Sequence, residues 1–395
     1  MEFADMEDVK FIRLAFCDLF GNQKNISIMP EELERAFDYG ISFDASAIKG
    51  FEAEVKSDLF LHPDPSTLTI LPWRPSNGRV VRMFCDIKYP NGTPFEKDTR
   101  YILKKAVSAA TEKGIACNIG AEAEFYLFKL DEDGNPTNEP FDNAEYMDIA
   151  PEDKAENIRR EICLSLESMG IIPETSHHEE GPGQNEIDFR YSDPLVSADN
   201  DITFKSVVKT IAMRNGAWAS FSPKPLSDCS GNGMHINISF GKDGYNENIL
   251  AGIMAHIKEI TAFLNPTVES YKRLGEKKAP KYISWSYENR SQLIRIPAPG
   301  SNDYKRLELR SPDPMTNPYL AYTLLIYSAL DGIENNLKAP EACNINLYNA
   351  DISDTSTYDK LPDSLSEALK ISASSEFINK IGFSEICEIY KKYLD

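Results

Sequence analysis

The chain has 395 residues, enough to bury a large core, and this length suggests two domains. Its 62 acidic and 42 basic residues give a formal net charge of −20. Phosphate groups attract the opposite charge, so this balance argues against nucleic acid or a membrane surface as a partner.

The sequence predicts a cytoplasmic protein. The first eight residues are acidic and lack an apolar core, so no secretory signal is expected. The most apolar window, Tyr319 to Leu330, is too short to span a bilayer. The seven cysteines are scattered, odd in number and without CxxC spacing, which indicates reduced thiols rather than disulfides or a zinc site.

The first part of the chain alternates short strands with turns. The expected elements are a strand hairpin at 9–29, a short helix from Pro30, and strands around 67–71 and 80–86. A turn-rich stretch follows at 89–94, and we place a domain boundary there. Residues 1–94 then form a small domain built on a sheet and one helix, and residues 95–395 form the larger one.

From Asp98 onward, helical periodicity alternates with strands whose residues are half polar. The predicted helices are 98–114, 152–169, 197–216 and 247–264, and the predicted strands are 116–130, 171–178, 217–222 and 234–240. This order favours an α+β domain with an antiparallel sheet. The sequence contains neither a Walker loop nor a dinucleotide fingerprint, so a nucleotide would have to bind in another way.

Four stretches place charged or metal-binding side chains at every second position: Glu122–Phe125, Glu186–Arg190, His235–Ser239 and Arg306–Arg310. Successive strand side chains point to opposite faces, so each stretch has one polar and one apolar face. Each alone is typical of the solvated face of an antiparallel sheet. Together, carboxylates, a histidine and arginines indicate a site for hard divalent metals and phosphate.

The carboxylates of this pattern are closely spaced. Glu122 and Glu124 lie on one strand face, about 7 Å apart by strand rise. A glycine-rich turn after the His177–His178 pair brings Glu179 and Glu186 close enough to share an ion. Taken singly, a histidine of this kind is more often a hydrogen-bonded interior residue than a ligand.

At this point the chain resembles the glutamine synthetases of bacterial and archaeal type. The resemblance lies in seven segments in the family's order: Phe43–Ile48, Gly120–Phe125, His177–Asp188, Lys224–His235, Asn265–Arg273, Asn289–Pro297 and Arg306–Leu320. It implies a small N-terminal β-grasp-like domain, residues 1–94, that contributes to the neighbouring subunit's site. It also implies a catalytic domain at 95–395 that binds ATP, glutamate and metal on an antiparallel sheet with flanking helices.

The resemblance assigns two or more metal ions to each site. The implied ligands are Glu124, Glu179 and Glu186 for one metal, and Glu122, His235 and Glu308 for another. Five carboxylates and one imidazole suit Mg²⁺ or Mn²⁺, and the lack of a thiolate argues against zinc.

Other positions match substrate contacts of the family. Residues matching contacts to glutamate and its surroundings are Arg273, Arg310, Gly231, Glu124 and His235. Arg290, Arg295 and Arg306 match arginines that hold the phosphates, a task suited to planar guanidinium groups. Glu174 and Ser239 fall where the family contacts ATP.

The implied reaction has two steps. ATP phosphorylates the γ-carboxylate of glutamate, and ammonia then displaces phosphate to give glutamine. The implied catalytic residues are Asp44, Arg290, Glu276 and Tyr146, with Asp44 reaching the neighbouring subunit's site. A homo-oligomer is therefore expected.

The chain departs from the family at the flap that follows Arg273. Lys278 stands where the family has a glutamate, and a lysine there should raise the Michaelis constant for ammonia; Glu276 is a candidate replacement. Ser230 replaces an asparagine that contacts the α-amino group of glutamate. These changes leave open a γ-glutamyl ligase for another amine, or a catalytically weak regulatory homologue.

Two further departures concern assembly. The connection from Phe240 to the helix near Asn248 is short, and the sequence ends without the family's C-terminal strap. Both features join stacked rings in the family, so a single hexameric ring is expected rather than a dodecamer.

Overall fold

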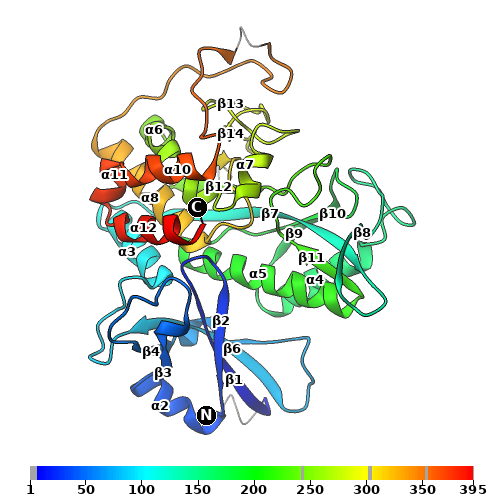
Figure 1. Cartoon of the computed structure of the whole chain (residues 1–395), viewed down its shortest axis with the longest axis vertical. Coiled ribbons are helices and arrows are strands. Elements are labelled where there is room, and N and C mark those ends of the chain that lie inside the picture. The colour runs from blue at the N-terminus through cyan, green and yellow to red at the C-terminus, as the bar shows by residue number, and fades with distance from the viewer. Residues whose placement is uncertain (1–6, 242–243, 301–304, 352–354, 395) are drawn as a thin grey trace.

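The computed structural model describes residues 7–241, 244–300, 305–351 and 355–394. Residues 1–6, which carry most of the acidic start of the chain, lie outside the described residues. Two sheets form two lobes, the first of them blue at the bottom of Figure 1 and the second above it. None of the helices in the described ranges is long and apolar enough to cross a membrane.

The lower lobe is a six-stranded sheet in the order β2-β1-β6-β4-β3, with β5 beside β6. Its strands are β1 (Val9–Cys17), β2 (Gln23–Ile28), β3 (Ile41–Asp44), β4 (Asp58–Pro63), β5 (Thr69–Ile70) and β6 (Arg79–Lys88). The predicted hairpin is confirmed as the antiparallel pair β1–β2, whereas β1 and β6 run parallel. The sequence pattern missed β3 and β4, which are short strands beside turns.

The upper lobe contains a nine-stranded sheet in the order β13-β14-β15-β12-β7-β10-β9, with β8 and β11 also paired to β7. Its strands are β7 (Cys117–Leu130), β8 (Pro136–Pro140), β9 (Pro173–His178), β10 (Gln184–Phe189), β11 (Ala217–Ser220), β12 (Met234–Phe240), β13 (Trp285–Tyr287), β14 (Ile294–Ile296) and β15 (Leu307–Leu309). The expected antiparallel sheet needs one correction: β13 and β14 are parallel, so the sheet is mixed.

Helices flank this sheet, which confirms the α+β class. They are α2 (Leu33–Asp38) in the lower lobe, then α3 (Thr99–Glu112), α4 (Glu156–Ser168), α5 (Pro194–Arg214), α6 (Glu247–Leu264), α7 (Val268–Arg273), α8 (Pro318–Glu334), α10 (Leu365–Ala373), α11 (Glu376–Lys380) and α12 (Ser384–Leu394). Helix α5 begins three residues before its predicted start. The Asp193 side chain accepts from the amides of Leu195 and Val196, and Pro194 occupies the first turn.

The longest strand, β7, separates the core from the site. Ala121, Ala123 and Phe125 are buried, and α5 packs against β7 and β11. Because side chains alternate along a strand, Glu122 and Glu124 point to the opposite face. That face is only partly buried, so the alternation predicted from the sequence separates an apolar core from a polar surface.

Among the contacts between the two lobes is a buried arginine, Arg100 on α3. Its guanidinium pairs with Asp64 at 2.8 Å and Asp86 at 2.9 Å in the lower lobe, and with Asp199 on α5 at 3.0 Å. Tyr319 of α8 donates to Asp199 at 2.6 Å. A buried cation shared by three carboxylates has most of its donors satisfied, so this contact fixes how the lobes meet.

Replacing this cation tests that role. We expect Arg100→Leu to lower the free energy of unfolding by about 3–5 kcal/mol, because it leaves the buried carboxylate of Asp199 and the partly buried ones of Asp64 and Asp86 without this partner. The matched control is Arg35→Leu, since Arg35 pairs with Glu32 at the surface, and its effect should stay within about 1 kcal/mol. Urea titration followed by circular dichroism measures both; equal midpoints for the two variants would contradict the assignment.

Candidate active site

The polar face of the second sheet opens into a cavity of about 1190 Å³. Its walls come from β7, β9, β10 and β12, from the loop at 146–150, and from the flap segment, which we define as residues 275–280. Thirteen of the predicted site residues line it: Glu122, Glu124, Tyr146, Glu179, Glu186, Gly231, His235, Arg273, Glu276, Arg290, Arg295, Arg306 and Arg310. Residues spread over nearly 190 positions are thus brought to one face.

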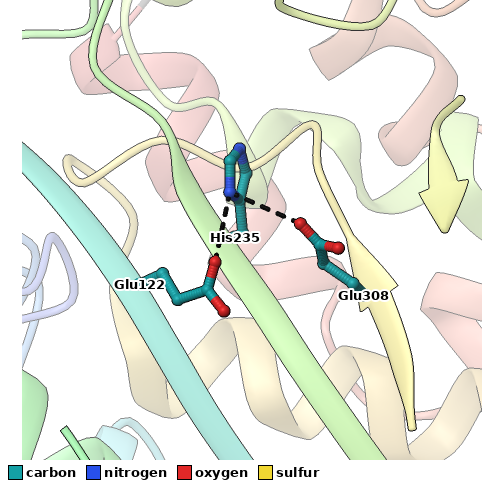
Figure 2. A group of neighbouring side chains, drawn as sticks. All are labelled: Glu122, His235 and Glu308. Atoms are coloured by element: carbon teal, nitrogen blue, oxygen red, sulfur yellow. Dashed lines mark ion pairs between the residues drawn. The ribbon is translucent and has the colours of Figure 1, made fainter. Parts of the chain in front are cut away.

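One group of possible metal ligands consists of Glu122 on β7, His235 on β12 and Glu308 on β15 (Figure 2). His235 Nδ1 lies 3.5 Å from a carboxylate oxygen of Glu122 and 3.5 Å from one of Glu308. The strand register causes this, because His235 is directly opposite Glu122. Oxygen Oε1 of Glu308 is buried and has no hydrogen-bond partner in the described part of the chain. An anionic oxygen of this kind fits a divalent cation.

The second group consists of His177, Glu179 and Glu186. His177 lies 3.6 Å from Glu179 and 3.9 Å from Glu186, which it faces across the β9–β10 pair. Glu124 also faces Glu186, across the β7–β10 pair, but accepts from the Gly233 amide at 2.8 Å. The geometry therefore adds His177 beside the predicted ligands Glu124, Glu179 and Glu186.

The two adjacent histidines have different surroundings. His178 is fully buried and its Nε2 bonds Asp142 at 2.9 Å, so it is an interior residue of the kind expected for an isolated histidine. His177 faces the cavity instead. The sequence analysis missed His177, although its place two residues before Glu179, on the same strand face, was a usable signal.

Charge is distributed unevenly among these carboxylates. Burial raises the pKa of Glu124 and of Glu179 to about 7. Burial and the nearby Asp188 raise the pKa of Glu186 well above its ordinary value. Burial also disfavours the charge of Glu122, but its contacts with His235, Asn237 and Arg306 outweigh that effect and lower its pKa to about 2. The second group therefore holds protons that a cation would displace.

Arginines line the same cavity, beside these carboxylates. Arg295 donates to Glu308, and Arg306 Nε donates to the Asn237 side chain at 2.7 Å. Arg310 is buried; its Nη1 lies 3.6 Å from Oε1 of Glu308, and its Nε has no hydrogen-bond partner among the described residues. A buried donor of this kind fits an anionic ligand. The arrangement can thus hold cations and, beside them, carboxylate or phosphate groups.

Two glycines, Gly231 and Gly233, leave the space that Arg273 occupies at the cavity. A Cβ on Gly233 would lie 2.6 Å from Arg273 Nη2, and one on Gly231 would lie 2.3 Å from the Pro223 carbonyl oxygen. Arg273 Nη1 donates to the Ser311 carbonyl at 2.8 Å. A side chain at either glycine would therefore displace the arginine or the backbone.

A second cavity of about 250 Å³ adjoins the first and shares Glu122, Thr175, Asp188 and Arg306 with it. The two residues predicted to contact ATP, Glu174 and Ser239, both line this second cavity. Arg306 therefore lies where the two cavities meet.

Two of the thirteen lining residues, Tyr146 and Glu276, are exposed, and one predicted residue, Asp44, lies away from the cavity. Tyr146 is half exposed and its ring packs edge-on against His177, and Glu276 is exposed on the flap segment. Asp44 is exposed at the end of β3, where it accepts from the Ser46 amide at 2.9 Å. It is absent from the described residues that line either cavity, which agrees with a role outside its own chain.

The two residues that depart from the family pattern, Lys278 and Ser230, contact the same residue. Lys278 pairs with Glu180, and Ser230 Oγ donates to the other oxygen of Glu180 at 3.2 Å. Lys278 is therefore not an uncompensated cation, and with Glu180 beside it Lys278 repels a nearby cation less than an unpaired lysine would.

Comparisons with known proteins agree with this geometry. Residues 8–90 match the family model described as glutamine synthetase, beta-Grasp domain, and residues 96–394 match glutamine synthetase, catalytic domain. The glutamine synthetase of Methanosarcina mazei is 46% identical, covering 96% of this chain and 89% of its own. That of Clostridium saccharobutylicum is also 46% identical, covering 94% and 88%.

Solved structures agree as well. A complex of GmaS with ADP has a TM-score of 0.88 at 30% identity, covering 99% of this chain and 94% of its own. The glutamine synthetase of Plasmodium falciparum has a TM-score of 0.85 at 26% identity, covering 98% and 92%. The small β-grasp domain followed by a larger catalytic domain is confirmed, and the boundary at residue 94 stays a prediction.

The raised pKa of Glu124 predicts a pH-dependent stability of the metal-free protein. Below pH 4.5, the ordinary pKa of a glutamate, Glu124 is protonated in both the folded and the unfolded chain. It then makes the free energy of unfolding neither larger nor smaller. As the pH rises to about 7, the unfolded chain ionises first, so the folded state loses stability, fully so above pH 7. Glu124→Gln should therefore raise the melting temperature at pH 8 more than at pH 5.

The same variant tests metal binding. Mn²⁺ should raise the melting temperature of the unmodified protein more at pH 8 than at pH 6, because protons compete for the carboxylates. Glu124→Gln should reduce this rise, whereas Glu112→Gln, an exposed change on α3, should leave it intact. A rise of the same size at both pH values would contradict the prediction.

Proposed function

Because the chain belongs to the glutamine synthetase family, we propose that it is an ATP-dependent glutamate–ammonia ligase. It joins ammonia to the γ-carboxylate of glutamate through γ-glutamyl phosphate, giving glutamine, ADP and phosphate. One observation carries the proposal: a single cavity is lined by metal-ligand groups and by arginines, two of which, Arg295 and Arg310, contact the candidate ligand Glu308. Phosphoryl transfer to a carboxylate requires both, since every reacting group is anionic.

Divalent metal ions fit this cavity. Glu122, His235 and Glu308 would hold one ion, and Glu179 and Glu186, with Glu124 or His177, would hold another. When bound, Mg²⁺ or Mn²⁺ supplies positive charge that offsets the charge on the transferring phosphoryl group. The buried oxygen of Glu308 that accepts no hydrogen bond in the described part of the chain and the raised pKa values of Glu124 and Glu179 support this assignment.

In the first step, the arginines orient two anions. Arg273 and Arg310 bind carboxylates of glutamate, supported by the buried Nε of Arg310, which makes no hydrogen bond in the described part of the chain. Arg290, Arg295 and Arg306 bind phosphate oxygens, and Arg306 lies where the two cavities meet. ATP then lies with its nucleoside in the smaller cavity, near Glu174 and Ser239. This brings the γ-phosphate to the γ-carboxylate.

In the second step, ammonium must lose a proton before it attacks. The exposed carboxylate of Glu276 and the ring of Tyr146 border the cavity where the amine would enter. The third group at the amine pocket is Asp44 of a neighbouring subunit, which acts as the base. We assign it to the neighbour because Asp44 does not line the cavity of its own chain. The active enzyme is therefore a homo-oligomer in the cytoplasm, where its seven free cysteines stay reduced.

Two alternative functions are weighed against the proposed one. A ligase that uses another amine is favoured by Lys278 and Ser230, which change two of the pockets that select substrate. A catalytically weak regulatory homologue is disfavoured by the six predicted metal ligands, all of which lie at or beside one cavity.

An amine panel separates these functions. With ATP, glutamate and Mg²⁺, we expect ammonia to give the highest rate of phosphate release, and we expect Glu308→Ala to lower that rate by at least about 100-fold because a metal ligand is lost. A higher kcat/KM with another amine selects the second function. Phosphate release that no amine stimulates selects the third.

Shared active sites predict complementation. Asp44→Ala and Glu308→Ala chains should each be inactive alone, but mixed oligomers should regain part of the activity, since some sites then combine two intact partners. A mixture of Asp44→Ala with Asp44→Asn chains is the control and should stay inactive. Activity that does not return on mixing would contradict a site shared between subunits.

Light scattering tests the size of the assembly. We expect the mass of six chains, since only a short connection separates the end of β12 at Phe240 from the start of α6 at Glu247. A twelve-chain mass would contradict the single ring.

A further inference from the structure

One carboxylate outside the predicted site, Glu180, connects three segments that border the cavity. Its two oxygens contact Lys278 of the flap segment and the Ser230 hydroxyl of the 228–233 loop. Its backbone amide donates to Glu179 at 3.1 Å, so the same residue adjoins a predicted metal ligand. All four residues line the cavity.

The flap segment is a tight turn that is held at Lys278. The Glu276 amide donates to the Arg273 carbonyl at 3.0 Å, and the Ala279 amide donates to the Glu276 carbonyl at 3.0 Å. Lys277 has a φ of 51°, in the left-handed region. The Tyr348 hydroxyl lies 2.8 Å from the Lys278 carbonyl oxygen and 2.5 Å from that of Arg290, and these two acceptors share its one hydrogen. The Lys278 main chain and side chain are therefore both anchored.

The side-chain anchor can release more easily than the main-chain anchor. The side chains of Lys278 and Glu180 are 63% and 33% exposed, so water and salt weaken their attraction. Lys278 Nζ also lies 6.0 Å from the centre of the Tyr146 ring, which borders the same side of the cavity. Glu276 of the flap segment and Tyr146 both line the cavity.

We propose that Glu180 is a positioning residue: through Lys278 it holds the flap segment over the cavity and so completes the binding site for the amine. The proposal rests on the proposed ligase function and adds a residue to it. Because no described residue of the flap segment lines the smaller cavity, the ion pair acts on the amine and not on ATP.

Charge reversal tests the pairing. We expect Glu180→Gln and Lys278→Gln each to raise the KM for the preferred amine by about twofold to fivefold, the range of a partly exposed ion pair, while the KM for ATP stays unchanged. The doubly reversed variant, Glu180→Lys with Lys278→Glu, should recover most of the lost affinity. The control is Lys338→Gln, since Lys338 forms a similarly exposed pair with Glu247 at 3.0 Å, away from the cavity.

Hydrogen exchange of residues 275–280 gives a second readout that needs no catalysis. Without substrates, these amides should exchange faster in the Glu180→Gln variant than in the unmodified protein. The doubly reversed variant should restore their protection from exchange. Two results would overturn the proposal. One is a Glu180→Gln variant in which neither the exchange rate of residues 275–280 nor the KM for the amine changes. The other is a doubly reversed variant whose KM for the amine rises as much as the two single substitutions would together predict. An unmodified enzyme without amine-dependent phosphate release would instead overturn the ligase function, and the exchange experiment would still decide the ion pair.

Discussion

Pairing of β7 with a strand on each side is the constraint on which the site depends. In a strand the side-chain period is two, so β7 can send Ala121, Ala123 and Phe125 into the core only by sending Glu122 and Glu124 to the other face. Partner strands then bring Glu186 and His235 opposite those two carboxylates. A shift of the register by one residue would bury the carboxylates among apolar side chains, so the energy of the core maintains a cluster of like charges that would otherwise separate.

The protein compensates these charges unevenly, and this asymmetry has a chemical meaning. Around Glu122 the compensation comes from the protein, through His235 and Asn237, and the carboxylate stays ionised. Around Glu124, Glu179 and Glu186 burial dominates, and the groups retain protons near neutral pH. The first group is therefore organised before any cation arrives, whereas the second becomes fully charged only when a cation replaces its protons.

Sequence patterns predicted the parts of this structure that depend on local periodicity. The long strand at 116–130 and the helix at 247–264 are such cases, as are the polar faces that carry Glu122 and His235. Contacts made by distant pairing were not predictable in the same way. The register of the β9–β10 pair places His177 opposite Glu186. Glu180 meets a lysine 98 residues away, and Arg100 meets carboxylates from two lobes. Short strands such as β3 were missed because four residues carry too little periodicity.

The buried arginine between the lobes has a consequence for the geometry of a ring. Arg100 helps to fix the lower lobe relative to the sheet of its own chain, while Asp44, at the end of β3 in that lobe, lines neither cavity in the described part of the chain. Under the proposed function Asp44 serves a neighbouring subunit, so the angle between the lobes sets where its carboxylate arrives. In the proposed ring a small change of that angle would accumulate from one subunit to the next. Contacts inside one chain, those of Arg100 and of Arg82 with Thr203, would in this way influence whether neighbouring subunits meet at the right distance.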